Sequence, residues 1–66
     1  MKIFLNNKEM QLPLPVTLEE LLLQENIPSA GTAVAINGKV VRRNDWTTRI
    51  LNDGDNIILI TAAYGG

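Results

Sequence analysis

The start of the chain places short apolar segments on either side of a polar interruption. The segments KIFL (2–5) and EMQLPL (9–14) flank the polar residues NNK, a pattern that indicates a β-hairpin. Pro13 and Pro15 are expected to end the second strand, because proline has no backbone N–H to donate to a sheet ladder. The sequence therefore opens with two predicted antiparallel strands.

The next segment, VTLEELLLQE, has the features of a helix start. Thr17 and Glu20 have the spacing of a capping box, in which each residue satisfies a free backbone N–H of the other. Val16 and Leu21 have the spacing of the accompanying hydrophobic staple. The helix is expected to end by residues 26–27, before a proline. Burying each leucine of its apolar face would contribute about 1.5–3 kcal/mol; these are Leu18, Leu21 and Leu22.

A second hairpin is the clearest local prediction. AVAI (33–36) and KVV (39–41) are β-type segments separated by Asn37 and Gly38. Asn-Gly is the preferred pair for a type I′ turn, because both central residues need a positive φ. We therefore read Asn37-Gly38 as a turn and not as a site.

The remaining segments predict an irregular connection and a closing strand. Residues 42–52 show no regular period, with one short helical turn expected to begin at Asn44 or Asp45. The segment DGD (53–55) is interpreted as a turn, since it lacks the further oxygen ligands that calcium requires. The almost continuous apolar run at 56–61 is typical of a central strand rather than an edge strand.

The predicted order is thus two strands, a helix, two strands, a turn and a last strand. One helix can cover only one face of such a sheet. Because the last strand is apolar on both sides, hydrophobic side chains should lie on the uncovered face. An exposed apolar patch of that kind usually marks a binding surface.

Composition excludes several kinds of chemistry. The 66 residues contain no Cys and no His, so disulfides, thiol nucleophiles, imidazole catalysis and typical zinc sites are ruled out. Six basic and seven acidic residues give a net charge of −1, and the basic residues are too scattered for a nucleic-acid interface. No apolar run approaches the ~20 residues of a membrane span. We expect a cytoplasmic protein that binds neither nucleic acid, membrane nor metal.

The whole chain resembles the ubiquitin-like β-grasp proteins, and among them the ThiS family, the sulfur carriers of thiamin (thiazole) biosynthesis. The resemblance is carried by four features of the sequence. It implies an α+β fold, with a mixed sheet of about five strands, one helix across one face and a flexible tail. Residues 1–62 would form the β-grasp domain and 63–66 the tail. The four features are AVAINGKVVRRNDW (33–46), LNDGD (51–55), the apolar strand that follows, and the final Gly-Gly.

The two terminal glycines have a physical rationale of their own. The Gly66 carboxylate is anionic at neutral pH and must be activated before a sulfur nucleophile can attack it. Nothing in this chain cradles a phosphate, so another protein must supply that site. Glycine has no Cβ and passes a narrow channel in any backbone conformation. The four residues after Ala62 would reach about 13–14 Å from the domain.

The resemblance implies how the tail is used. An E1-like adenylyltransferase of the ThiF type uses ATP to adenylate Gly66, and the carrier itself binds no cofactor and is not an enzyme. A sulfur donor protein then converts the adenylate to a thiocarboxylate, which delivers sulfur to a thiazole synthase of the ThiG type. Gly65 is the hinge of the tail, while Ala63 and Tyr64 line the entry; relatives often have a smaller residue in place of Tyr64.

The likeness to ubiquitin also assigns faces to the last strand. Ile57 and Leu59 are expected to point toward the helix. Ile58 and Ile60 should lie beside Phe4 on the open face, where we expect the partners to dock.

Several alternatives remain open at this point. The chain could be the small subunit of a molybdopterin synthase, a carrier for tRNA thiolation, a protein modifier that joins Gly66 to lysines, or a plain interaction domain. Arg42 and Arg43 could contact an acidic partner, although solvated basic pairs are more common. Trp46 is interpreted as a lid over one end of the core rather than as a ligand platform.

Overall fold

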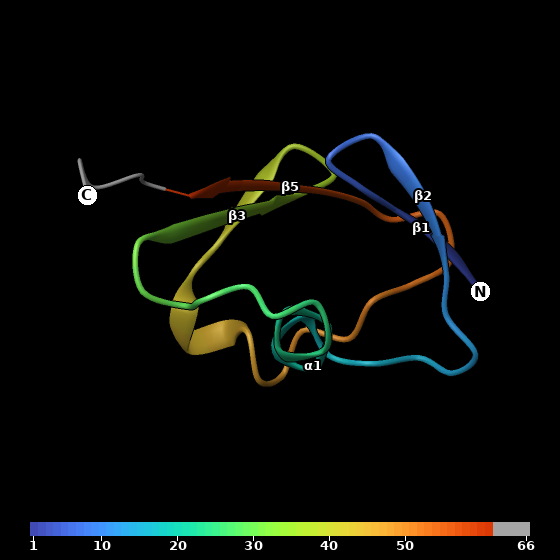
Figure 1. The fold of residues 1–66 in the computed structure, drawn as a ribbon, viewed down its shortest axis with the longest axis horizontal. Helices are drawn as coiled ribbons and strands as arrows, with labels where there is room; N and C mark the ends of the chain where they lie inside the picture. Colours follow the sequence, from blue (N-terminus) through green and yellow to red (C-terminus); the bar gives the residue numbers. More distant parts are fainter. Residues whose placement is uncertain (62–66) are drawn as a thin grey trace.

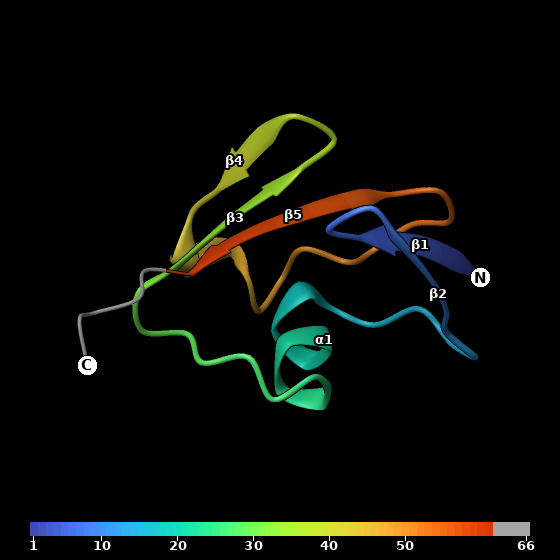
Figure 2. The ribbon, with the colours of Figure 1, turned by 45° about the horizontal axis from the view of Figure 1, so that its top comes forward.

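The computed structural model describes residues 1–61 of the 66-residue chain. Within these residues, five strands form one mixed sheet and one α-helix covers one of its faces (Figures 1 and 2), which confirms the predicted β-grasp arrangement. The strand order is β2-β1-β5-β3-β4, with β1 parallel to β5 and the other neighbours antiparallel. The last strand is central, as its apolar run predicted. The elements are β1 Lys2–Leu5, β2 Lys8–Gln11, α1 Leu18–Gln24, β3 Thr32–Ile36, β4 Lys39–Val41, the 3-10 helix η1 Arg43–Asp45, and β5 Asn56–Thr61.

The first hairpin has a tighter turn than the polar segment suggested. Asn6 and Asn7 both have positive φ, 48° and 67°, and Leu5 pairs directly with Lys8. Asparagine tolerates this left-handed region better than most residues. Two residues therefore make the turn, and Lys8 belongs to β2.

The second strand is shorter than predicted at its other end. It was expected to continue to residue 14 but ends at Gln11. Beyond Gln11, the Leu12 N–H donates to the Met1 carbonyl at 2.8 Å, and the Met1 amino group donates to the Leu12 carbonyl at 2.7 Å. Pro13 follows and has no N–H to continue the ladder. Proline thus ends the pairing before the apolar pattern ends.

The helix begins with the predicted capping box. The Glu20 N–H donates to Thr17 Oγ1 at 3.2 Å, and the Thr17 N–H donates to Glu20 Oε1 at 2.8 Å. At the other end Asn26 has a φ of 58°, and the Ile27 N–H donates to the Leu22 carbonyl at 2.9 Å. This is a Schellman-type stop. No helix within residues 1–61 is long and apolar enough to cross a membrane.

The second hairpin turns at Asn37 and Gly38, with φ of 52° and 84°, as a type I′ turn requires. These two residues lie between the closing pair Ile36 and Lys39. The Asn-Gly prediction is confirmed.

The short helical turn begins earlier than predicted. Arg42 precedes it in an extended conformation without a side-chain cap, so the expected start at Asn44 or Asp45 was wrong. The Asp45 N–H donates to the Arg42 carbonyl at 2.8 Å and closes the turn. The indole Nε1 of Trp46 donates to the Val41 carbonyl at 3.0 Å, which ties this turn to the end of β4.

The core lies between α1 and one face of the sheet. Trp46 is 4% exposed and belongs to this core, in agreement with its interpretation as a structural residue. Val16, the predicted staple residue, packs against the same cluster. The buried hydrophobic residues are Ile3, Leu12, Leu18, Leu21, Leu22, Val34, Ile36, Trp46, Leu51 and Ile57.

Candidate functional site: the end of the last strand and the open face

The candidate site begins where β5 ends. This strand pairs with β3 along its length, from Ile36 opposite Ile57 to Thr32 opposite Thr61. The central strand of the sheet therefore leads directly into the C-terminal residues (Figure 1). Two predictions concern the part of the chain outside the described residues. One is the domain boundary after residue 62. The other is the set of tail residues expected to enter a partner, namely Ala63, Tyr64, Gly65 and Gly66.

The two faces of β5 carry different side chains, as predicted. Ile57 is fully buried and Leu59 packs against the core on the helix side. Side chains alternate along a strand, so Ile58 and Ile60 point to the opposite, open face. Ile58 is half-buried, whereas Ile60 is 67% exposed. Phe4 is also half-buried and lies on this open face, because its neighbours Ile3 and Leu5 face the core.

The strand register adds a residue that the sequence analysis did not include. Ala35 lies opposite Ile58 on one side and opposite Val40 on the other, and paired residues share a face. Val40 is 79% exposed and therefore extends the apolar surface across β4. The alternation of KVV hinted at one outward valine, but only the register shows that it joins Ile58.

Charged residues border this surface on the β1–β2 side. Lys2 Nζ lies 5.9 Å from the centroid of the Phe4 ring and 3.9 Å from Glu9 Oε1. Both charged side chains are about half exposed, so the pair contributes little stability. Phe4 thus lies between an apolar region and a polar rim, which is a common composition for a protein interface.

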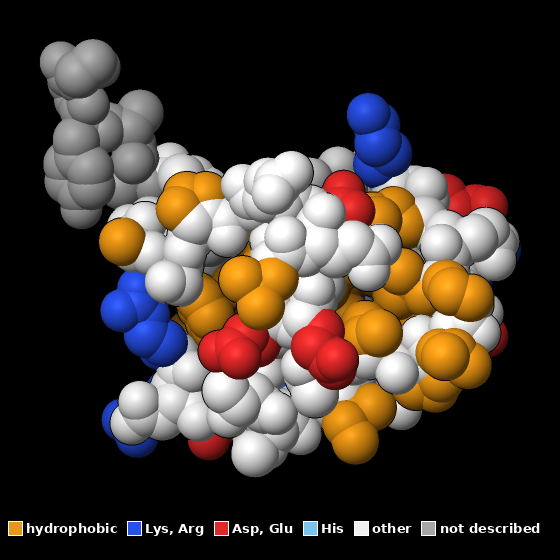
Figure 3. All heavy atoms as spheres, turned by 60° about the horizontal axis from the view of Figure 1, so that its bottom comes forward, with side chains coloured by type: hydrophobic (Ala, Val, Ile, Leu, Met, Phe, Trp, Pro, Cys, Tyr) orange, Lys and Arg blue, Asp and Glu red, His pale blue; other side chains and the backbone are white. Residues whose placement is uncertain are grey.

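The helix-side face differs from the open face. Figure 3 shows it with acidic side chains near its middle and hydrophobic side chains gathered toward one end. The exposed large hydrophobic residues outside the strands are Leu14, Leu23 and Ile50. They come from a loop, the helix and a second loop, and are not held in one strand register.

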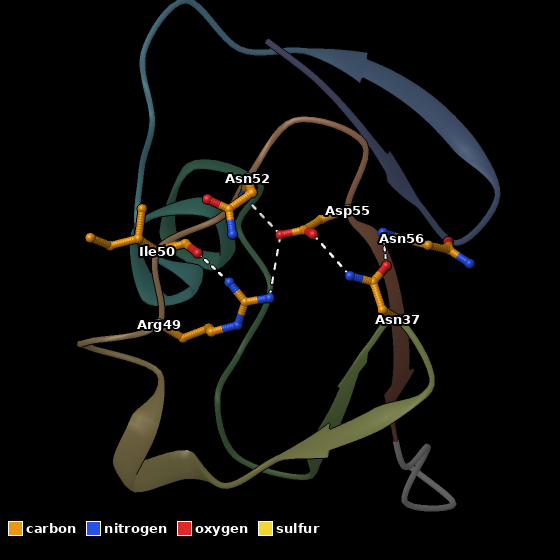
Figure 4. A network of polar contacts seen from close by, with 6 residues as sticks. All are labelled: Asn37, Arg49, Ile50, Asn52, Asp55 and Asn56. Carbon is orange, nitrogen blue, oxygen red and sulfur yellow. Dashed lines mark hydrogen bonds and ion pairs between the residues drawn. The ribbon is translucent and has the colours of Figure 1, made fainter.

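A buried polar network fixes the start of β5 (Figure 4). Asp55 is 5% exposed; its Oδ1 accepts from Asn37 Nδ2 at 2.9 Å, and its Oδ2 accepts from the Asn52 N–H at 2.7 Å. Arg49 lies 3.4 Å from the same Oδ2. The Asn56 N–H donates to Asn37 Oδ1 at 2.9 Å. The second hairpin and the turn before β5 are therefore joined through one carboxylate.

Sequence reasoning read Asp53-Gly54-Asp55 as a turn, and the structure agrees. Gly54 has a φ of 85°, and Asp53 Oδ1 accepts from the Lys2 N–H at 2.7 Å. What the sequence did not indicate is that Asp55 is buried, because its partners Asn37 and Arg49 come from other segments.

The basic pair after β4 lies at the end of the sheet where β5 ends. Val41, the last residue of β4, pairs with Val34 near the start of β3, and the start of β3 lies opposite the end of β5. Arg42 and Arg43 follow Val41 and therefore lie near the end of β5. Arg43 donates to the Ser29 carbonyl and lies 5.7 Å from the Trp46 ring. Arg42 is exposed and makes no ion pair within residues 1–61. Arg43 therefore has a structural role, and Arg42 remains available to a partner.

Residues 1–61 contain no pocket and no cluster of three His, Cys, Asp or Glu side chains that could hold a metal ion. Among the described residues, the features that can contact another molecule are the open face and the end of β5, after which the sequence continues to Gly65 and Gly66.

The sequence model of the ThiS family matches residues 2–66. The chain is 41% identical over 66 residues to the sulfur carrier protein ThiS of Escherichia coli K12, and the alignment covers all of both chains. The crystal structure of the thiamine biosynthesis protein ThiS from Geobacter metallireducens superposes with a TM-score of 0.85 at 25% identity and full coverage of both chains. A solution structure from the same organism gives a TM-score of 0.82 at 25% identity, covering 100% of this chain and 88% of the other. The chain belongs to the ThiS family.

Proposed function

We propose that this chain is a sulfur carrier of thiamine biosynthesis, a co-substrate rather than a catalyst. The observation that carries the proposal is the full-length match to a family whose Escherichia coli member is named a sulfur carrier protein. The last two residues of the sequence, Gly65 and Gly66, support it, because an unhindered terminal carboxylate is the group that such a carrier must present. Family membership also favours thiamine over the molybdopterin and tRNA alternatives.

The proposed chemistry takes place at the Gly66 carboxylate. One carboxylate oxygen attacks the α-phosphorus of ATP in a ThiF-type adenylyltransferase, the α–β phosphoanhydride bond breaks, and pyrophosphate leaves. The terminal sulfur of a persulfide on a sulfur donor protein then attacks the acyl carbon, and AMP leaves. A thiol reduces the resulting sulfur–sulfur bond, which leaves a thiocarboxylate on Gly66.

The thiocarboxylate then serves as the sulfur source for a ThiG-type thiazole synthase. Each of these steps needs a nucleotide site or a nucleophile that we assign to the partners. The chain contributes the acyl group, with Gly65 as the hinge and Ala63 and Tyr64 lining the entry to the partner's channel.

The globular part would recognise the partners through its open face. Phe4, Ile58 and Ile60 lie on the side of the sheet that α1 does not cover, and Val40 extends this surface. Docking of this face outside a partner's cleft leaves the tail free to enter it. Burial of apolar side chains would supply the affinity.

Intact-mass analysis tests the proposal. The chain is incubated with the ThiF-type enzyme of the same genome, ATP and a persulfide-bearing donor. We expect a mass gain equal to the exchange of one oxygen for one sulfur, located at Gly66 by fragmentation. A chain extended by one alanine beyond Gly66 serves as the control and should stay unmodified, because its new carboxylate no longer lies where the adenylation site expects it.

Other outcomes separate the alternatives. Covalent ladders of the chain on lysines of other proteins would indicate a protein modifier and contradict the proposal. Thiocarboxylate that forms but never supports thiazole synthesis, while it supports molybdopterin formation or tRNA thiolation, would assign the carrier to the other pathway.

A further inference from the structure

The second half of β5 has one backbone edge without a neighbouring strand. Pairing between β1 and β5 ends at Leu5 opposite Ile57, whereas pairing between β3 and β5 continues to Thr61. Asn6 and Asn7 turn the chain away at this point. In Figures 1 and 2 the β1–β2 hairpin accordingly ends beside the middle of β5, which continues with β3 alone.

The backbone groups that face this edge can be identified from the hydrogen bonds nearby. The Asn6 N–H donates to the Ile57 carbonyl at 2.8 Å, and the Leu59 N–H donates to Asn6 Oδ1 at 2.7 Å. Alternate residues of a strand direct their N–H and C=O groups to the same side. The Leu59 carbonyl and the Thr61 N–H therefore point to this edge as well, and no strand among residues 1–61 lies there to pair with them.

This edge lacks the features that usually prevent strand addition. The outer edge of the sheet on β2 carries the charges of Lys8 and Glu9, and β4 is only three residues long. By contrast, β5 has the sequence NIILIT, with no charge and no proline. An uncharged, apolar and unpaired edge is a template for another strand.

We propose that an extended segment of the adenylating partner pairs with β5 at Leu59 and Thr61, in the position that β1 leaves vacant. This inference rests on the proposed function and specifies how the partner recognises the carrier. The five residues 62–66 continue from Thr61 and have to enter the partner, so a strand of the partner that starts here would guide the tail from its base.

A second copy of this chain fits the edge less well. Only three backbone groups of the described residues face it, the Leu59 carbonyl and the N–H and carbonyl of Thr61, whereas stable dimers bury roughly 1,200–2,000 Å² of surface. The partner also gains contact with Ile60, 67% exposed, and with the tail that follows. Strand addition and docking of the open face then form one continuous interface.

A single-atom change at the edge tests the proposal. The chain is short enough for total chemical synthesis, so the Thr61 amide can be replaced by an ester, which removes the N–H and keeps the side chain. Thr61 lies opposite Thr32 and does not use this N–H to pair with β3, because the bonded pair beside it is Ala33 with Ile60. The Kd for the ThiF-type enzyme, measured by calorimetry without ATP, should rise about 3- to 10-fold, the value of one lost neutral hydrogen bond.

The matched control is an ester at Gln11, on the far edge strand of the sheet. The two-residue turn makes Leu5 and Lys8 a bonded pair, so Ile3 and Met10 are bonded as well and the Gln11 N–H points off the outer edge of β2. This ester should leave the Kd unchanged, and neither ester should alter the melting temperature appreciably. A Kd unaffected by the Thr61 ester, or equally weakened by both esters, would overturn the proposal.

Two further readouts distinguish the related hypotheses. The first is sedimentation of the free chain. If the chain formed a dimer and the Thr61 ester abolished it, the free edge of β5 would bind a second copy, and the proposal of an adenylating partner would be refuted. The Thr61 ester could weaken binding to the enzyme although the parent chain never gained sulfur. That result would support strand addition at β5 and refute the proposed function.

Discussion

Removal of the Asp55 carboxylate should destabilise the fold more than any other single deletion of a charged group in the described structure. The carboxylate is 5% exposed and accepts two hydrogen bonds shorter than 3 Å, from Asn37 Nδ2 and from the Asn52 N–H. In Asp55→Ala both donors lose their partner in a partly buried site. Arg49, whose side chain is 30% exposed, loses its ion pair as well.

The expected loss can be estimated from these contacts. A hydrogen bond to a charged acceptor contributes about 1.5 kcal/mol at the lower end of its range, so two contribute about 3 kcal/mol. The long contact with Arg49 is screened by solvent and adds little. Since 1 kcal/mol shifts the melting temperature of a domain this small by about 4–8 °C, the variant should melt about 12–24 °C lower. That is most of the stability that so small a domain commands.

Thermal and urea unfolding followed by circular dichroism measure the effect. Asp53→Ala is the matched control, because Asp53 lies in the same turn but makes its bond to the Lys2 N–H at an exposed position. It should cost less than about 1 kcal/mol. If the two variants lost equal stability, or if Asp55→Ala melted within a few degrees of the parent, the network would not hold the start of β5 as we argue.

Three further predictions follow from particular contacts. Ile60→Asp should raise the Kd for the adenylating enzyme at least about tenfold with little change in melting temperature. Leu23→Asp, at a position equally exposed (70%) on α1, should change neither quantity. Equal effects of the two variants would contradict docking through the open face. Gly38→Ala should lower the free energy of unfolding, measured in urea, by about 1 kcal/mol. The cause is backbone strain alone, because φ is 84° and an added Cβ meets nothing within 4 Å. A much larger loss would indicate a clash that the structure does not contain. The hydrogen bond from the Thr17 backbone N–H, and secondarily the Thr17 hydroxyl, lowers the pKa of Glu20 in the folded state; its contribution is therefore fully present above the unfolded-state pKa and is lost as the pH falls through the folded-state pKa. Stability measured across the acidic range should decline less steeply in Glu20→Gln, and an identical slope would refute the assignment.

The local chemistry of the chain was readable from the sequence. The capping box of Thr17 and Glu20 and the turn at Asn37 and Gly38 depend on residues within a few positions of each other, so spacing alone specified them. The terminal glycines likewise belong to the sequence, since the chemistry of a carboxylate with no neighbouring side chain needs no fold to be stated. The strand and helix types followed from the period of the apolar residues.

The tertiary structure decided which distant segments meet. Asp55 is buried because Asn37 and Arg49 converge on it from a hairpin and a loop, and Val40 joins Ile58 only through their common neighbour Ala35. The free edge at the end of β5 exists because Asn6 turns β1 away two pairs into the parallel ladder. Such features depend on strand order and register, which arise from contacts across the whole chain; a one-residue shift in register would move every side chain of a strand to the other face.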